Sequence, residues 1–162
     1  RKTEQYGADG YDEVEFMIST NPGEPLKPLG RIASGGELSR VMLAIKTVLA
    51  DQDAIDTVIF DEIDTGISGR TAQKVSEKLA LIGKSRQVIC ITHLAQLAAM
   101  ADSHYCIEKF AAGGGTQTSI RRLTEEEAVD ELARILGGAS ITESVKENAR
   151  EMRRLALQLK EK

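Results

Sequence analysis

Two short apolar runs in the middle of the chain, with a helical segment between them, constrain the fold more than any other feature. Residues 57–60 and 88–91 are continuous apolar runs of strand length, and residues 70–82 between them have the pattern of a helix. A strand–helix–strand order joins parallel strands by a right-handed crossover. Short runs without polar alternation are typical of strands buried on both faces. The sequence therefore predicts an α/β fold with mostly parallel core strands flanked by helices.

Further elements are predicted on both sides of this core from periodicity and from turn residues. They are a strand at 14–18, a loop at 21–30, a helix from near residue 36, a short helix at 94–101, a hairpin with strands at 104–110 and 118–123 that turns at 113–115, and two closing helices, the last at about 141–160. Thr124 with Glu127, and Ser140 with Glu143, fit capping boxes at the starts of the closing helices. The many charges of the last helix suggest that it packs loosely or on a partner.

Composition limits the classes of function. The chain has 162 residues, of which 41% are hydrophobic and only 4% aromatic, which predicts one domain with an aliphatic core. Its formal net charge of −4 gives no overall basic field for nucleic acid. Cys90 and Cys106 lack metal-ligand spacing and are expected to be buried thiols. No apolar run approaches the ~18 residues of a membrane span, so no membrane partner is expected.

The residues Ser34, Gly35, Gly36 and Glu37, here named the SGGE loop, form the first candidate site. Two glycines before a helix let backbone N–H groups converge on an anion, and the helix dipole favours negative charge there. The Ser34 hydroxyl is a further donor, so the loop can hold a phosphate without a lysine. The alternative is structural, because Ser34 and Glu37 also fit a capping box.

Two more candidate sites follow the predicted core strands. Asp61 and Glu62 follow residues 57–60, where an aspartate can hold Mg²⁺ through water and a glutamate can orient or deprotonate an attacking water. His93 follows the second strand and can donate a hydrogen bond to a γ-phosphate. The structural alternatives are that Asp61 and Glu62 are exposed turn acids or a helix cap, and that His93 is structural or simply exposed. His104 lies inside a predicted strand and is expected to be structural.

Together, and in this order along the chain, the three sites resemble the ABC ATPase superfamily. The SGGE loop resembles its signature motif, Asp61 and Glu62 its Walker B aspartate and catalytic glutamate, residues 63–68 its D-loop, and His93 its switch histidine. The strings ASGGELSR, IFDEIDTGISG, THLAQLAAMAD and LARILGG are similar to the RecN family, bacterial DNA repair proteins related to the structural maintenance of chromosomes (SMC) proteins. The similarity covers nearly the whole chain.

This resemblance implies an ATPase head that binds ATP and Mg²⁺ between two copies and acts in DNA double-strand break repair and recombination, in the cytoplasm and at the nucleoid. Residues 1–12 would lead in from a coiled coil, and residues 13–162 would form the C-terminal half of the head as a single domain. Glu62 and His93 would be catalytic, Asp61 would hold Mg²⁺, and the SGGE loop would face the nucleotide of the opposite head. The implied partners are the N-terminal Walker A half of the same protein, a second head and DNA.

No Gly-x-x-x-x-Gly-Lys-Ser/Thr motif is present, so the chain lacks Walker A and is expected to be inactive alone. The fragment at 83–85 has Lys78 where the first glycine should stand, and it runs from helix to strand. Glu37 replaces the usual Gln of transporters, and Ser68 replaces the D-loop aspartate of many ABC proteins. Ser68 is instead expected to cap the helix at 70–82, and Asp64 does not occupy the matching place.

Three alternatives stay open at this point. The chain could be the ATPase half of a transporter, although Glu37 and Ser68 argue against it. It could belong to another SMC-like or Rad50-like branch. In a different class of function, it could be a non-catalytic interaction module in which the acids and the SGGE loop are only helix caps.

Overall fold

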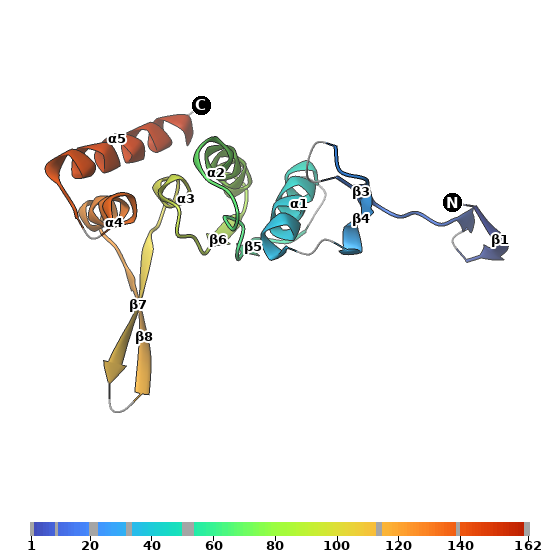
Figure 1. Cartoon of the computed structure of the whole chain (residues 1–162), viewed down its shortest axis with the longest axis horizontal. Helices are drawn as coiled ribbons and strands as arrows, with labels where there is room; N and C mark the ends of the chain where they lie inside the picture. Colours follow the sequence, from blue (N-terminus) through green and yellow to red (C-terminus); the bar gives the residue numbers. More distant parts are fainter. Residues whose placement is uncertain are drawn as a thin grey trace.

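The computed structural model of the chain describes residues 2–8, 10–19, 23–31, 34–49, 54–112, 115–138 and 140–160. Figure 1 shows the elements following one another along the long axis, from small N-terminal strands to two C-terminal helices. The described residues form four two-stranded sheets, of which one is parallel and lies at the centre of the chain. No helix in these residues is long and apolar enough to cross a membrane.

The parallel sheet confirms the predicted crossover. β5 (Thr57–Phe60) pairs with β6 (Gln87–Cys90) in register over all four residues, and α2 (Gly69–Gly83) connects them. The helix buries an apolar face whose members recur at helical spacing: Ala72, Val75, Leu79 and Ile82. This face packs against one side of the strands, so the α/β prediction is confirmed. The expectation that both faces of the strands are buried is wrong, because Ile59 and Ile89 on the other side are exposed.

α1 (Gly35–Val48) lies beside α2 and begins close to the predicted position. Its buried residues are Gly36 and Leu43, and Leu43 joins Phe60 and Ile63 in the core. Several apolar residues that recur at helical spacing in this segment are exposed: Leu38, Met42, Ile45, Val48 and Leu49. No element in the described part of the chain covers that face of α1.

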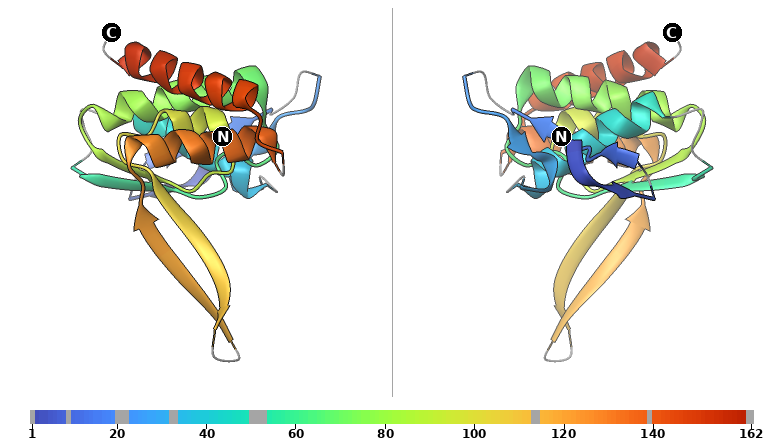
Figure 2. Two further views of the ribbon diagram at one scale, coloured as in Figure 1. Left: turned by 90° about the vertical axis from the view of Figure 1, so that its left-hand side faces the viewer. Right: turned by 90° about the vertical axis from the view of Figure 1, so that its right-hand side faces the viewer.

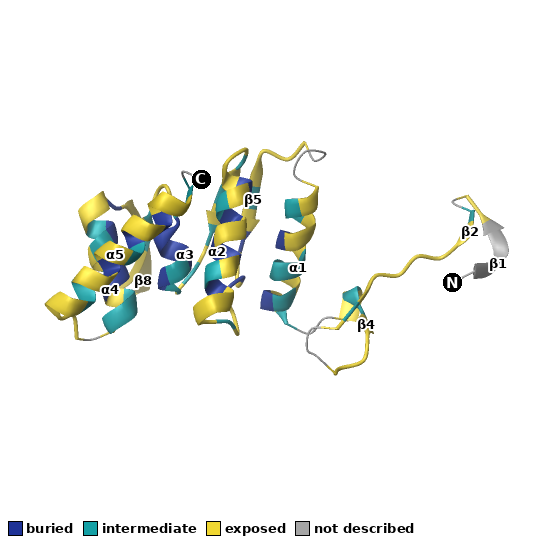
Figure 3. Ribbon diagram, turned by 90° about the horizontal axis from the view of Figure 1, so that it is seen from above, coloured by how far each residue is buried: buried dark blue, intermediate teal, exposed yellow. Residues whose placement is uncertain are grey.

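A second core joins three helices at the C-terminal end: α3 (Ala95–Ala99), α4 (Glu125–Gly137) and α5 (Glu143–Lys160). The buried members of this second core are Ala95, Ala98, Ala99, Met100, Leu132, Ala133, Ala149 and Ala156. Most of these side chains are small, which lets the three helices approach one another closely. In Figure 3 the buried positions lie on the facing sides of these helices and of α2.

The buried Arg153 anchors α5 to both neighbouring helices. Its guanidinium pairs with the Glu125 carboxylate at 2.7 and 3.0 Å. It also donates to the carbonyl oxygens of Ala99 and Ala101, at 2.7 and 2.5 Å, where α3 leaves carbonyl groups without helical partners. The inner face of α5 is therefore firmly packed, contrary to the expectation of a loosely held helix.

The predicted hairpin is confirmed as β7 (Tyr105–Ala112) and β8 (Gly115–Arg122), which are antiparallel. Figure 2 shows it extending away from the helices. Gly113 and Gly114, where the turn is predicted, lie outside the described residues. A two-stranded hairpin is marginally stable by itself in water. The directly opposed Ile107 and Ile120 are nevertheless exposed, so this apolar pair has no cover in the described structure.

The N-terminal strand is predicted wrongly. The expected strand at 14–18 is reduced to β3 (Met17–Ile18), which pairs with β4 (Lys27–Pro28) in the predicted loop. Alternation produces a stable strand when one face is buried, whereas Val14 and Phe16 are 79% and 74% exposed. A second short pair lies in the predicted lead-in, namely β1 (Lys2–Gly7) with β2 (Gly10–Asp12).

Helix caps follow the sequence in part. The capping box of Thr124 and Glu127 is present in full at the start of α4. The box of Ser140 and Glu143 is wrong, because Glu143 is the first residue of α5 and the Thr142 hydroxyl accepts the hydrogen bond from the Val145 N–H at 3.4 Å. The prediction for Ser68 is half right: it stands at the N-cap of α2, but its side chain makes no capping hydrogen bond.

Candidate nucleotide site

The predicted site residues lie at one edge of the parallel sheet. Because β5 and β6 run in the same direction and in register, the residues that follow them leave the sheet at a common edge. Asp61 and Glu62 follow β5, and His93 follows β6 after two further residues. The first turn of α1 reaches this edge as well, since its glycines lie against Glu62. The fold thus brings three separate motifs into one region.

Gly36 is required by close backbone packing at the start of α1, and Gly35 lies against the Glu62 side chain. A Cβ atom on Gly36 would lie 2.9 Å from the carbonyl oxygens of both Glu62 and Thr65. A Cβ atom on Gly35 would overlap the carboxylate of Glu62. A residue without a side chain is needed where backbone approaches backbone this closely. Gly36 therefore lets α1 lie against the loop that follows β5, whereas the exposed Glu62 carboxylate could move away from a side chain at position 35.

Two polar side chains of α1 strengthen this contact. The Ser39 hydroxyl donates to the carbonyl oxygen of Asp61 at 2.9 Å. The Arg40 guanidinium donates to the carbonyl oxygens of Ile63 at 3.1 Å and Thr65 at 2.8 Å. The motif analysis gave neither residue a role, because nothing in its spacing distinguishes a side chain bonded to a distant loop from a solvated helix residue.

Ser34 stands at the N-cap of α1 without capping it. Its backbone is extended and its carbonyl accepts from the Leu38 N–H at 3.1 Å, but its side chain makes no capping hydrogen bond. The capping-box alternative for Ser34 and Glu37 is therefore wrong. Glu37 lies in the first turn, where a carboxylate interacts favourably with the helix dipole. Ala33, the first residue of the quoted motif, lies outside the described residues.

Asp61 and Glu62 are both exposed and share a tight turn. The Asp61 Oδ1 accepts from the Glu62 backbone N–H at 2.8 Å. Glu62 has φ = 56°, the left-handed region that non-glycine residues seldom occupy and that often marks functional positions. In the described residues no group of three or more His, Cys, Asp or Glu side chains could hold a metal. A single Asp61 carboxylate fits Mg²⁺, which keeps most of its water ligands.

His93 contacts a residue that the sequence analysis set aside. Its Nδ1 lies 3.0 Å from the Asp64 Oδ2, and its backbone N–H donates to the same oxygen at 2.9 Å. The Thr92 hydroxyl donates to that oxygen as well, at 2.6 Å. Asp64 therefore connects the loop after β5 to the loop after β6. The signal available in the sequence was an acid three residues beyond Asp61, which by itself indicates no partner.

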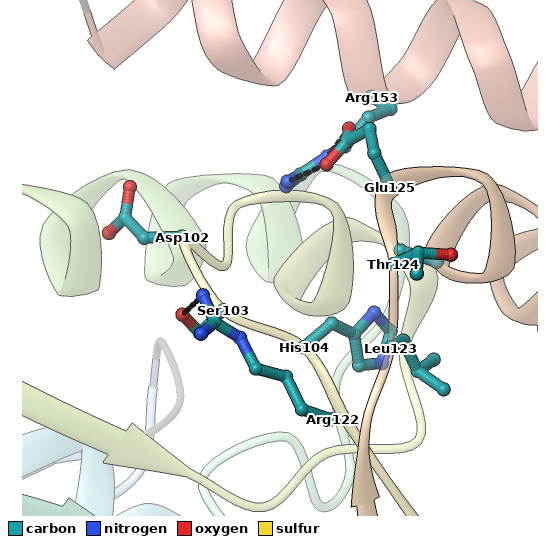
Figure 4. Close-up of a pocket in the computed structure, with 9 residues that line it drawn as sticks. Asp102, Ser103, His104, Arg122, Leu123, Thr124, Glu125 and Arg153 are labelled. Atoms are coloured by element: carbon teal, nitrogen blue, oxygen red, sulfur yellow. Dashed lines mark hydrogen bonds and ion pairs between the residues drawn. The ribbon is translucent and has the colours of Figure 1, made fainter.

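The two cysteines, expected to be buried, are only partly buried. Burial, together with the charges of Asp64 and Asp61, raises the pKa of the Cys90 thiol to about 12, so this thiol stays neutral. Cys106 is a free, partly buried thiol as well. Burial lowers the pKa of the half-buried His104. It lines a pocket at the base of the hairpin beside α4 and α5, with Arg122 and Arg153 among its neighbours (Figure 4).

The chain is similar over almost its whole length to proteins described as DNA repair protein RecN. It is 52% identical over 152 residues to the protein of Halalkalibacterium halodurans, 49% over 156 residues to that of Bacillus subtilis and 51% over 148 residues to that of Treponema pallidum. These matches cover 94%, 96% and 91% of this chain but only 27%, 27% and 26% of the relatives, so the chain spans about a quarter of their length.

Other comparisons add little. No protein-family model matches the chain. A solved structure from work on ATP-driven dimerization and DNA-stimulated activation of SMC ATPases covers 74% of this chain and 79% of its own, with 23% identity and a TM-score of 0.47. That likeness is too weak to carry an argument. The identity to the three relatives is far higher and extends over both cores, so the chain belongs to the RecN family, of which it matches a C-terminal segment.

Proposed function

We propose that the chain is the C-terminal half of an SMC-like ATPase head, which binds and hydrolyses ATP with Mg²⁺ when the Walker A half is supplied. The observation that carries the proposal is the meeting of two motifs at one sheet edge, where Asp61 and Glu62 follow β5 and Asp64 contacts His93 after β6. Carboxylates and a histidine at the carboxyl edge of a parallel sheet are well placed for a nucleotide. Phosphoryl transfer depends mainly on such positioning and on electrostatics.

Each residue has a definite role in this proposal. Asp61 holds Mg²⁺ through its water shell, and Glu62 orients and deprotonates the attacking water. His93 contacts the γ-phosphate from the neighbouring loop. The SGGE loop faces the nucleotide of a second head. Its donors are the Ser34 hydroxyl, which makes no capping hydrogen bond, and the backbone N–H groups at the start of α1. The exposure of Asp61, Glu62 and His93 leaves these groups accessible to such a ligand.

Two uncovered apolar faces support the need for another half of the head. On the sheet, Ile59 is 65% exposed and Ile89 43% exposed, although both belong to strands with a hydrophobic composition. On α1, the apolar face with Leu38, Met42, Ile45, Val48 and Leu49 is exposed to solvent as well. Exposed patches of this kind mark surfaces that associate with something else. We propose that the N-terminal half of the same protein covers the sheet face and contributes the P-loop.

By analogy with the relatives, the assembled head closes with a second head across ATP and acts on DNA in double-strand break repair and recombination. Residues 1–12 then lead in from a coiled coil, and residues 13–162 form one lobe. The family membership supports this assignment, whereas the net charge of −4 provides no attraction to DNA by itself. The DNA contacts are therefore proposed to lie mainly in other parts of the protein.

An association measurement tests the proposal. In heads assembled from this chain and its N-terminal half, Ser34→Arg should block ATP-dependent pairing, because the larger cation fills the place of the phosphate. Glu62→Gln should preserve pairing, because only the water-activating carboxylate is lost. Ultracentrifugation with and without ATP and Mg²⁺ distinguishes the two. Normal pairing of the Ser34→Arg heads would mean that the SGGE loop does not face the nucleotide.

A further inference from the structure

We infer that Asp64 is a positioning residue for His93, which holds the imidazole by Nδ1 and leaves Nε2 as the ring nitrogen that faces a ligand. This inference deepens the proposed function, since the ligand of His93 is there the γ-phosphate. The geometry itself does not depend on that function. It consists of one buried carboxylate, two hydrogen bonds that it accepts from the loop after β6, and its close contact with the His93 Nδ1.

Three groups of this loop lie around a single oxygen atom. The Asp64 Oδ2 accepts hydrogen bonds from the Thr92 hydroxyl at 2.6 Å and from the His93 backbone N–H at 2.9 Å, and the His93 Nδ1 lies 3.0 Å from it. A bare Nδ1 at 3.0 Å would place its lone pair against the lone pairs of this oxygen, whereas an Nδ1–H group can be attracted to it. The contact therefore favours the Nδ1–H tautomer of the neutral ring.

The exposure of the two side chains gives the contact its direction. The Asp64 side chain is 4% exposed, whereas the His93 side chain is 73% exposed. The ring is thus anchored at its inner nitrogen and open on its outer side. A histidine that binds a ligand through one nitrogen is commonly oriented by a hydrogen bond at the other. The arrangement here has that form, with Nε2 on the free side.

The anchor is itself held on both sides. The Thr92 hydroxyl that donates to Asp64 also accepts from the Leu94 N–H at 3.0 Å, at the entry to α3. Asp64 belongs to the loop whose carbonyl oxygens at Ile63 and Thr65 accept from Arg40 of α1. The orientation of the His93 ring is therefore linked through Asp64 to both α1 and α3.

A purely structural role for Asp64 would need only the bonds to Thr92 and to the backbone of His93. The contact with Nδ1 is what distinguishes positioning from loop support. The test must therefore read the ring itself. The chain contains only two histidines, His93 and His104. Long-range ¹H–¹⁵N spectra of the imidazoles at about pH 9, above the ordinary histidine pKa of ~6.5, report the tautomer of each ring, and His93→Gln assigns the signals.

We expect His93 in the native chain to be protonated at Nδ1 and bare at Nε2. Asp64→Ala should shift the ring toward the Nε2–H form or an average of both, and unchanged His104 signals would show that the fold persists. If Asp64→Ala unfolds, Asp64→Asn retains the size and should still change the Nδ1 signal. Asp56→Asn, which removes the same charge at the other end of β5, should leave the ring unaltered. A native ring in the Nε2–H form, or one insensitive to Asp64, overturns the inference.

A second readout separates this inference from the proposed function. In the assembled head, Asp64→Asn should lower kcat roughly tenfold, the scale on which partners of a functional histidine act, with a smaller change in KM. In a His93→Gln background the same change should have little further effect, because both act through one ring. If Asp64→Asn lowered kcat equally in the native and His93→Gln backgrounds, Asp64 would not act through the His93 ring and the positioning role would be wrong. If His93→Gln hydrolyses ATP normally while the tautomer is as expected, the role of His93 in the proposed function fails and the anchoring stands.

Discussion

The replacement Gly36→Ala tests the close packing of α1 against the loop after β5. An added Cβ would lie 2.9 Å from the carbonyl oxygens of Glu62 and Thr65, about 0.5 Å closer than the 3.4 Å at which ordinary contact begins. Both atoms belong to backbone, so relief requires α1 and the loop to move apart. The Arg40 guanidinium, 3.0 Å from the same Cβ, would have to move too.

The expected result is a net loss of stability. Forcing an extra carbon into packed structure costs about 1–3 kcal/mol, and the better helix propensity of alanine offsets up to ~1 kcal/mol of this. We expect a net loss of about 1–2 kcal/mol. In a domain of this size that lowers Tm by roughly 2–8 °C. The measurement is urea and thermal unfolding of the chain, followed by circular dichroism.

Gly83→Ala provides the matched control, since Gly83 is also helical and has no atom within 4 Å of an added Cβ. It should be neutral or slightly stabilising. Equal stability of the two variants would show that α1 does not approach the loop as closely as described. In that case the contact between the SGGE loop and Glu62 would lose its support.

Three further predictions concern the C-terminal core and the cysteines. Arg153→Ala should lower the free energy of unfolding by roughly 2–3 kcal/mol, because it removes charge-assisted hydrogen bonds from the carbonyl groups of Ala99 and Ala101. The control Arg154→Ala, at an exposed position, should hardly change the urea midpoint. Similar midpoints for the two variants would refute the anchoring role of Arg153. The hydrogen bond from Arg153 lowers the pKa of Glu125 below its ordinary value of 4.5. The stability that ionised Glu125 contributes is therefore present above pH 4.5 and is lost as the pH falls through the lowered pKa. Unfolding curves taken across this range should show that a Glu125→Gln chain lacks this part of the acid-induced loss of stability. Iodoacetamide at about pH 8 should modify Cys106 before Cys90, because the Cys90 thiolate is scarce; mass spectrometry showing the reverse order would contradict the burial of Cys90.

The sequence was most informative where local pattern and burial agree. The runs at 57–60 and 88–91 are apolar and of strand length, and the helix between them has a clear apolar face that is buried, so the crossover could be predicted although one face of the two strands is exposed. The hairpin and the capping box at Thr124 follow from equally local rules. Asp61 and Glu62 follow one predicted strand and His93 follows the next, so their common position at one sheet edge could be expected from the parallel order of the strands.

The sequence was least informative where a residue acts through a distant partner. The buried ion pair of Arg153 spans 28 residues and the contact of Asp64 with His93 spans 29, and no local period reveals either. Arg40 reaches its carbonyl partners over a similar separation. The strand predicted at 14–18 failed for the opposite reason, because a good local pattern found no surface in this chain on which to pack.

Steady-state ATP hydrolysis by the assembled head tests the central claim most directly. The chain would be combined with its N-terminal half, and native Glu62 compared with Glu62→Gln under the same conditions. The account predicts no turnover by the chain alone, turnover on assembly, and a loss on the order of 10²-fold or more with Glu62→Gln, the scale of general acid–base catalysis. A folded, ATP-bound assembly that does not turn over, or that turns over equally with Glu62→Gln, would contradict it and favour a non-catalytic interaction module.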